Sequence, residues 1–342
     1  MSATHLSELP PSVSQLALGL SEAASLPDCP HTKLGHIPRP RPRVISASKR
    51  TDIPAFYLPW MIERCEAGWV DVPNPMFRHA SDPLRRLTHV SLLPEHVIAI
   101  AWWSKNYRVY QKNYKAFEKY RRQYFQFTIN PRRPDLEWLE PDVPSVEEAL
   151  SQMEFLAKLP GGPGMVAWRY DPLCFWIDNG AHLNSWDPGF FERLCRDLTA
   201  LGVRTCFTSI ADLYGKAVRR VERLYPGRTL RDPTDEELEP IAMEMSGIAG
   251  QYGMRLFTCT EVRLREYQGF SKGACIDGSL LKASAAGATD RKMQGREECG
   301  CTLHTDIGDY ESQECGYSCV YCYANPNRRG LALRQSKPEA GA

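Results

Sequence analysis

Short apolar runs alternate with longer amphipathic segments along the middle of the chain. The runs are rich in β-branched and aromatic residues, which is typical of strands buried on both faces of a sheet. We predict strands over residues 44–48, 69–72, 97–103, 124–129, 165–168, 203–209 and 255–259. Between several of these strands the apolar residues recur with helical spacing, so helices are expected to connect them.

Three of the connecting segments carry start and stop signals of helices. Ser145 and Thr234 are each followed three residues later by a glutamate, which is the pattern of a capping box. Asp187 precedes Pro188, a favoured first helical residue, and glycines mark the ends. The predicted helices run from Ser145 to about residue 159, from Asp187 to Gly202, and from Thr234 to Gly253.

The alternation of helices and strands predicts the fold class. It favours an α/β protein with a parallel sheet covered by helices, and the number of units over residues 41–262 favours a (β/α) TIM-like barrel or partial barrel. A doubly wound open sheet is the alternative. Residues 1–40 and 329–342 are predicted to be a disordered N-terminal extension and tail. Residues 263–328 are predicted to be a cysteine-rich iron–sulfur segment that packs on the barrel mouth.

Polar residues follow one predicted strand after another. The active site of a (β/α) barrel lies at these carboxyl-terminal strand tips, although loops are also polar without any function. The candidate catalytic residues are Arg50, Asp52, Lys105, Arg169 and Asp171. The candidate cofactor-binding residues are Arg50, Lys105, Ser209 and Glu261. Arginine and lysine suit carboxylate or phosphate groups, which predicts an anionic ligand.

Composition narrows the classes of function. The 342 residues carry a formal net charge of +1, so charge alone gives no indication of a nucleic-acid partner. No apolar stretch is long enough for a membrane span, and the N-terminus does not resemble a secretory signal. With 12 cysteines, such a chain is expected in the reducing cytoplasm, where cysteines serve as ligands or buried thiols rather than disulfides.

The most specific motif is C-x3-C-x2-C, formed by Cys315, Cys319 and Cys322 and followed at once by Tyr323. Three thiolates at this spacing can hold a [4Fe–4S] cluster and leave one iron open to a small molecule. A structural zinc site is the alternative. The aromatic Tyr321 between the last two cysteines favours the iron–sulfur interpretation, because aromatic residues shield such clusters from water.

A second centre is conceivable in the same part of the chain. Cys259, Cys275, Cys299 and Cys301 could supply four ligands to a second iron–sulfur cluster or to zinc. Cys-Gly-Cys at 299–301 also occurs in plain turns, so the sequence leaves this centre open. His304 lies between the two cysteine groups and is interpreted as a solvent-facing loop residue.

Four stretches together resemble the domain of unknown function 1848 family, and the resemblance extends over about residues 43–328. They are 45–56 (ISASKRTDIPAF), 168–172 (WRYDP), 273–277 (GACID) and 315–325 (CGYSCVYCYAN). The C-terminal cysteine motif is also similar to the cluster loop of radical S-adenosylmethionine enzymes. Its residues 319–324 particularly resemble those of spore photoproduct lyase-like DNA repair enzymes.

The resemblance implies a [4Fe–4S] cluster that binds S-adenosylmethionine and generates a 5′-deoxyadenosyl radical on an unknown substrate. It also implies a reductant protein such as ferredoxin or flavodoxin. In radical S-adenosylmethionine enzymes the motif follows the first barrel strand, whereas here it follows the last recognisable one. The order therefore looks circularly permuted, and the residues that grip the methionine end must lie upstream of the motif.

Three hypotheses follow. The first is a radical S-adenosylmethionine-like enzyme. The second is a related DNA-repair lyase-like enzyme acting on nucleic acid, which the near-neutral charge does not favour. The third is a non-catalytic module that binds zinc or a closed iron–sulfur cluster.

Overall fold

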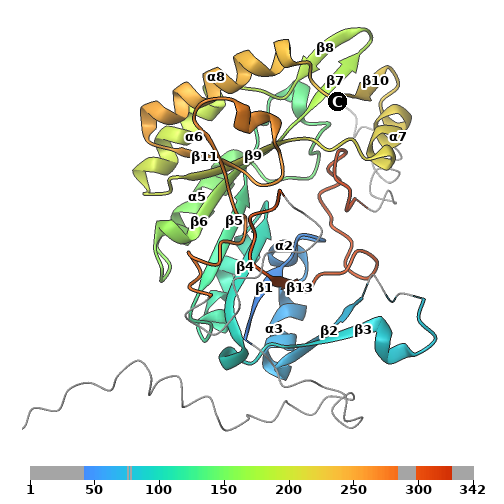
Figure 1. The fold of residues 1–342 in the computed structure, drawn as a ribbon, viewed down its shortest axis with the longest axis vertical. Helices are drawn as coiled ribbons and strands as arrows, with labels where there is room; N and C mark the ends of the chain where they lie inside the picture. The colour runs from blue at the N-terminus through green and yellow to red at the C-terminus, as the bar shows by residue number, and fades with distance from the viewer. Residues whose placement is uncertain (1–41, 75–76, 78, 284–297, 326–342) are drawn as a thin grey trace, which may run out of the picture.

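The computed structural model of the chain describes residues 42–74, 77, 79–283 and 298–325. Its centre is a parallel sheet of eight strands (Figure 1). In sheet order the strands are β13 (His304–Asp306), β1 (Arg43–Ala47), β4 (Val97–Ser104), β5 (Gln123–Thr128), β6 (Val166–Leu173), β9 (Thr205–Ile210), β11 (Arg255–Thr258) and β12 (Phe270–Lys272). The predicted disordered ends, residues 1–40 and 329–342, lie outside the described residues.

Strand order follows the chain from β1 to β12, and only β13 departs from it by pairing with β1. Within the described residues, β12 and β13 are the two edges of the sheet and do not pair with each other. The parallel α/β class is therefore confirmed. The strands follow one another in the order found in a (β/α) barrel. In the described residues, however, β12 and β13 do not pair, so a closed barrel is not shown.

The run at 69–72 does form a strand, but not in the main sheet. Strand β2 (Trp69–Pro73) pairs antiparallel with β3 (Leu87–Ser91) in a separate two-stranded sheet. Its residues alternate between buried and half-exposed, as expected for a strand covered on one face only. A third sheet has the order β10 (Arg228–Leu230), β7 (Phe175–Asp178) and β8 (Ala181–Asn184). The sequence pattern predicted none of β12, β13 and these three strands, because each has only three or four residues.

The three helices with clear sequence signals are present. They are α5 (Val146–Ala157), α6 (Pro188–Ala200) and α8 (Asp235–Tyr252). Thr234 forms a reciprocal capping box with Glu237, and Gly253 ends α8 in the left-handed conformation, with φ of 69°. The remaining α-helices are α2 (Ile53–Phe56), α3 (Leu58–Ala67), α4 (Arg108–Asn113) and α7 (Gly215–Leu224). None of the helices in the described ranges combines the length and the apolar character that a membrane crossing requires.

The two faces of the main sheet are covered differently. On one face, strand residues such as Trp102 and Trp168 pack against helical residues such as Phe191 in the largest core cluster. On the other face, Tyr124 and Phe207 belong to a second cluster, in which none of the described residues belongs to an α-helix. Its remaining members come from neighbouring strands and from the cysteine-rich segment. A doubly wound sheet would carry helices on both faces, so the structure does not support that alternative.

Candidate functional site

The C-x3-C-x2-C loop lies at the carboxyl-terminal edge of the main sheet. It follows β13, which is parallel to β1, so the segments after both strands leave the sheet at the same edge. Two tyrosine hydroxyls fasten them together. Tyr57 donates to the carbonyl of Glu314 at 2.7 Å, and Tyr323 donates to the carbonyl of Lys49 at 2.7 Å. The cysteine loop is therefore held against the segment that contains Arg50 and Asp52.

Arg220 of α7 holds the same loop from the other side. Its side chain is 1% exposed and donates to the backbone carbonyls of Val320, Cys322 and Asn325. The Asn325 side chain in turn donates to the carbonyl of Cys319 at 2.9 Å. Burial lowers the pKa of Arg220, and the neighbouring Cys322 and Cys319 oppose that shift. A buried guanidinium with carbonyl partners fixes the backbone on which two of the thiols stand.

Of the three motif cysteines, Cys319 is buried, and Cys315 and Cys322 are half-buried. Burial raises the pKa of the Cys319 and Cys322 thiols and raises that of Cys315 to about 12. Lys105 opposes the shift at all three, and the backbone N–H of Ala324 donates to Cys322 Sγ at 3.4 Å. Thiols in such a site stay protonated unless a metal group takes the thiolates.

The motif thiols are also spread apart. In the described part of the chain, only Cys259, Cys299 and Cys301 form a group of metal-binding side chains whose ligand atoms all lie within 4.8 Å of one another. At least one pair of the Cys315, Cys319 and Cys322 sulfurs is therefore farther apart than that. In a cubane cluster each cysteine binds a different iron, so its sulfurs stand farther apart than the ligands of a single ion.

A buried ion pair lies beside this loop. Lys105, directly after β4, places Nζ 2.8 Å from Glu140 Oε1, and both side chains are largely buried. The Tyr321 hydroxyl of the cysteine motif donates to the same carboxylate, as does Asn130 Nδ2 at 2.7 Å. Burial opposes the charge on Glu140, but Lys105, Tyr321 and Asn130 together bring the pKa of Glu140 below its usual value. Glu140 thus remains ionised in a dry environment.

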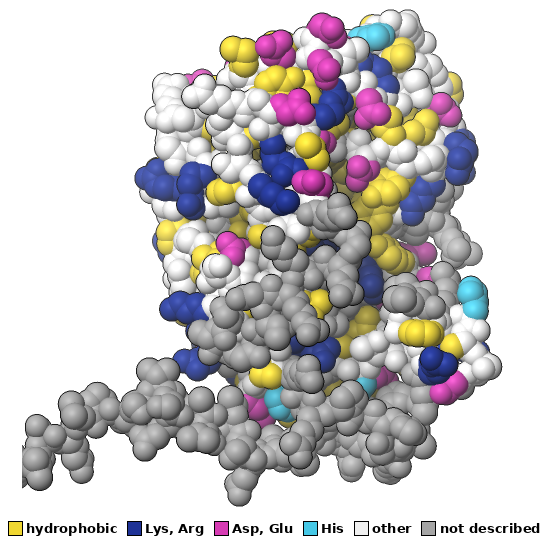
Figure 2. Space-filling model, in the orientation of Figure 1, with side chains coloured by type: hydrophobic (Ala, Val, Ile, Leu, Met, Phe, Trp, Pro, Cys, Tyr) yellow, Lys and Arg dark blue, Asp and Glu magenta, His cyan; other side chains and the backbone are white. Residues whose placement is uncertain are grey.

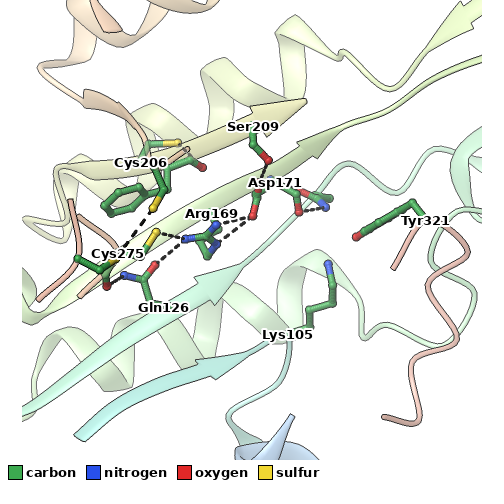
Figure 3. A network of polar contacts seen from close by, with 12 residues as sticks. Lys105, Gln126, Arg169, Asp171, Cys206, Ser209, Cys275 and Tyr321 are labelled. Carbon is green, nitrogen blue, oxygen red and sulfur yellow. Dashed lines mark hydrogen bonds and ion pairs between the residues drawn. The ribbon is translucent and has the colours of Figure 1, made fainter. Parts of the chain in front are cut away.

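A second ion pair lies on the face of the sheet that the cysteine-rich segment covers (Figure 3). Arg169 Nε and Nη2 lie 3.0 and 2.5 Å from Asp171 Oδ2, while Nη1 reaches Gln126 Oε1 at 3.1 Å and Cys275 Sγ at 3.4 Å. Ser209 Oγ donates to the other oxygen of Asp171 at 2.5 Å. The guanidinium of Arg169 therefore divides its bonds between a carboxylate and a thiol.

Asn130 connects the two ion pairs. Its Oδ1 accepts from the backbone N–H of Asp171 at 2.9 Å, and its Nδ2 donates to both Asp171 O and Glu140. A continuous path of hydrogen bonds and ion pairs consequently joins the two cysteine groups. Its members, which we call the polar path, are Tyr321, Glu140, Asn130, Asp171, Arg169 and Cys275.

Two predicted site residues, Asp52 and Glu261, accept hydrogen bonds mainly from nearby backbone N–H groups. Asp52 is buried and accepts hydrogen bonds from Ser104 Oγ at 2.8 Å, Lys105 N at 2.9 Å and Ala55 N at 2.9 Å. Burial raises the pKa of Asp52 to about 7 despite these bonds. Glu261 accepts from the N–H of Arg263 at 2.8 Å, a local turn contact that does not join the polar path.

Arg50 and His304 occupy less expected positions. Arg50 Nη1 donates to Gly308 O at 3.1 Å, and its guanidinium carbon lies 5.8 Å from the ring centre of Tyr310. The interpretation of His304 as a solvent-facing loop residue is wrong, because it stands in β13 and is partly buried. Its Nδ1 is 2.7 Å from Thr302 O and its Nε2 is 3.3 Å from Lys49 Nζ. Burial lowers the pKa of His304 to about 4.

Sequence reasoning missed Glu140 and Arg220. Glu140 lies outside the strand tips on which the search concentrated, although it follows the apolar pair Trp138 and Leu139. Arg220 resembles a surface residue because Arg219 precedes it, yet it falls on the buried stripe of α7 with Ala217 and Val221. The helical spacing of that stripe is the signal that could have identified it.

A family model described as "Domain of unknown function (DUF1848)" matches residues 44–324. No curated protein matches the chain. The matched range includes all seven cysteines from Cys259 to Cys322 and every member of the polar path.

Replacing Arg220 with methionine should loosen the cysteine loop. Methionine fills similar space but removes one donor from each of three carbonyl oxygens, of which Cys322 O keeps the N–H of Asn325. We therefore expect the free energy of unfolding to fall by on the order of 3 kcal/mol. Amide hydrogen exchange should accelerate across residues 319–325 before the rest of the chain. Arg219→Met, an exposed neighbour on the same helix, is the matched control. Equal effects of the two substitutions would contradict the role given to Arg220.

The buried carboxyl of Asp52 should make stability depend on pH. With its pKa raised to about 7 from 3.8, folded Asp52 keeps a proton that the unfolded chain releases between these values. The free energy of unfolding should therefore fall as pH rises from about 4 to about 7, by the Asp52 contribution. Denaturant unfolding across this range should show a flatter profile for Asp52→Asn than for the exposed control Asp232→Asn. Identical profiles would show that Asp52 ionises normally.

Proposed function

The chain belongs to the DUF1848 family, and from this premise we propose that it is a radical S-adenosylmethionine-like enzyme whose [4Fe–4S] cluster is held by Cys315, Cys319 and Cys322. When bound, such a cluster supplies the electron that splits S-adenosylmethionine into methionine and a 5′-deoxyadenosyl radical, which takes a hydrogen atom from a substrate. The substrate is not identified by the site.

The observation that carries the proposal is the position of β13. In the chain the motif follows the last strand, but in the sheet it follows an edge strand that lies beside β1. If the strands are counted across the sheet from β13, the motif comes after the first one. That is its position in radical S-adenosylmethionine enzymes, so the pairing supports a circularly permuted relation to their partial barrel.

The surroundings of the motif suit a cluster. The Cys319 thiol is buried, the Cys315 and Cys322 thiols are half-buried, and at least one pair of the three sulfurs stands more than 4.8 Å apart, which suits one cysteine per iron. Aromatic rings stand around them. The ring of Tyr323 lies 5.4 Å from that of Tyr214 and 6.0 Å from that of Tyr310. Such rings limit the access of water, which tunes the potential of a cluster.

Arg50 is the side chain best suited to bind an anionic ligand at this edge. Lys105 and Arg169 were equal candidates in the sequence, but their charges are already matched by Glu140 and Asp171. Within the described contacts, the Arg50 side chain donates one hydrogen bond, to a carbonyl, and forms no ion pair. A guanidinium in this state can offer a forked pair of donors to a carboxylate such as that of methionine. Lys105 and Arg169 would then position their partners Glu140 and Asp171 near the ligand rather than bind the ligand themselves.

No specific observation favours the alternatives for this loop. On the face that Figure 2 displays, basic side chains are interspersed with acidic and hydrophobic ones rather than gathered in a stripe, so a nucleic-acid substrate gains no support there. A single zinc ion needs its ligand atoms close together, and at least one pair of the motif sulfurs stands more than 4.8 Å apart, so the compact group of Cys259, Cys299 and Cys301 suits zinc better than the motif does.

Anaerobic reconstitution with iron and sulfide tests the proposal. We expect the loop to bind about four irons per chain, with an EPR spectrum of the reduced protein that changes when S-adenosylmethionine is added, and 5′-deoxyadenosine as a product. Cys319→Ser should lose this iron and the product. Cys195→Ser, which alters a buried thiol of α6, should retain both. A spectrum indifferent to S-adenosylmethionine, or iron retained by Cys319→Ser, would refute the assignment.

A further inference from the structure

We propose that Cys259, Cys275, Cys299 and Cys301 bind one zinc ion in a tetrahedral sulfur site, which fastens together the two open edges of the main sheet. This site is separate from the C-x3-C-x2-C loop, and the proposal does not depend on the activity of that loop. The four ligands come from three segments: the ends of β11 and β12, and the approach to β13.

The sulfur distances point to a single ion. Cys259 Sγ lies 3.8 Å from Cys299 Sγ and 4.0 Å from Cys301 Sγ, and all three sulfurs lie within 4.8 Å of one another. Four sulfurs placed tetrahedrally at about 2.3 Å from zinc stand about 3.8 Å apart. The observed separations therefore match the edges of a zinc tetrahedron.

Iron–sulfur clusters fit these distances less well. In a two-iron cluster only two cysteines share an iron, and in a cubane each cysteine has its own. In either cluster at least one of three cysteine sulfurs would stand well away from the other two, whereas the sulfurs of Cys259, Cys299 and Cys301 all lie within 4.8 Å of one another. Tetrahedral coordination by four sulfurs without sulfide is typical of zinc.

We assign Cys275 as the fourth ligand, although its sulfur does not lie within 4.8 Å of all three others. Cys275 is buried in the same cluster as Cys299 and Cys301, Cys259 packs against that cluster, and Arg169 and Lys49 are close enough to Cys275 to interact with it electrostatically. A zinc ion with four thiolates carries a net charge of about −2, and two cationic side chains near the site offset it. Arg169 Nη1 donates to Cys275 Sγ at 3.4 Å, and the N–H of Ile276 donates to Cys301 Sγ at 3.4 Å. Such donors are the usual surroundings of a metal thiolate.

Two glycines allow the ligand segments to approach. A Cβ at Gly300, between two ligands, would lie 3.0 Å from the carbonyl oxygen of Gly273. A Cβ at Gly273 would lie 2.6 Å from the ring of Phe207 and 2.7 Å from Cβ of Phe257. Cys-Gly-Cys is therefore more than a plain turn here, because close backbone contact brings both thiols to the same point.

The proposed zinc site lies where the two edge strands of the main sheet are not paired. Strands β12 and β13 are not joined by a ladder in the described structure, although Thr302 N donates to Ile276 O at 2.9 Å near the ligands. The ion would link these segments where strand pairing does not. It would also hold Cys275 against Arg169, and so fix one end of the polar path. Metal binding of this kind contributes directly to folding.

Metal analysis of the full-length protein, purified with a reductant and without added iron, tests the proposal. We expect about one zinc per chain in the wild type and in Cys319→Ser, but almost none in the double variant Cys299→Ser/Cys301→Ser. The double variant should also melt at a lower temperature. Cys195→Ser should keep its zinc and its melting temperature. Zinc retained by the double variant, or iron in its place in the wild type, would overturn the assignment.

Cobalt substitution covers the case in which the double variant does not fold. Replacing zinc with Co²⁺ in folded Cys319→Ser should give the intense visible bands of a tetrahedral cobalt thiolate, and zinc should abolish them. This measurement separates the site from the C-x3-C-x2-C loop, which is disabled in that variant. A spectrum of octahedral cobalt, or no cobalt bound in competition with a weak chelator, would refute the sulfur site.

Discussion

The pairing of β13 with β1 is the interaction on which the other features depend. Only three residues of β13 take part, yet Asp306 reinforces the contact by accepting from Ser46 Oγ at 2.8 Å, Ser48 Oγ at 2.6 Å and Lys49 N at 2.7 Å. These donors hold the carboxylate and its partners in one geometry. Because this pairing is parallel, the cysteine loop emerges at the carboxyl-terminal edge of the sheet. Without it, the motif would have no fixed relation to the strand tips.

Two ion pairs lie along the polar path: Lys105 with its member Glu140, and Arg169 with Asp171. Their surroundings are buried, so an unpaired charge there would be costly. Each pair also contacts a cysteine group, through Tyr321 and through Cys275. The two cysteine groups are therefore joined by a continuous set of hydrogen bonds and ion pairs.

The sequence allowed much of the fold to be predicted, for identifiable reasons. Long apolar runs such as 97–103 and capped helices such as that after Thr234 carry local signals strong enough to fix their type. The strand at 69–72 has the same local signal, but its partner β3 is a neighbour in the chain, and periodicity does not specify partners. The short strands β12 and β13 exist because of their partners, so no window of sequence could reveal them.

The candidate site was predictable to a similar degree. Residues at strand tips, such as Arg169, Asp171 and Ser209, do meet, because parallel strands bring their ends together. The roles of those residues were harder to infer. Lys105 and Arg169 resemble anion-binding groups in the sequence, yet each has its own carboxylate, and only the folded chain shows that Glu140 supplies one of them. Pairing of charges depends on contacts between distant segments, which composition and spacing do not contain.

The two cysteine groups differ in a way that spacing in the sequence does not disclose. Cys315, Cys319 and Cys322 come from one loop, yet at least one pair of their sulfurs is more than 4.8 Å apart. Cys259 and the Cys299–Cys301 pair come from two segments distant in the chain, yet their sulfurs all lie within that distance of one another. Ligands that share one ion must stand at the edges of its coordination polyhedron, while ligands of a cluster are separated by the cluster itself. The compact group thus meets the distance condition of a single-ion site, and the loop group does not.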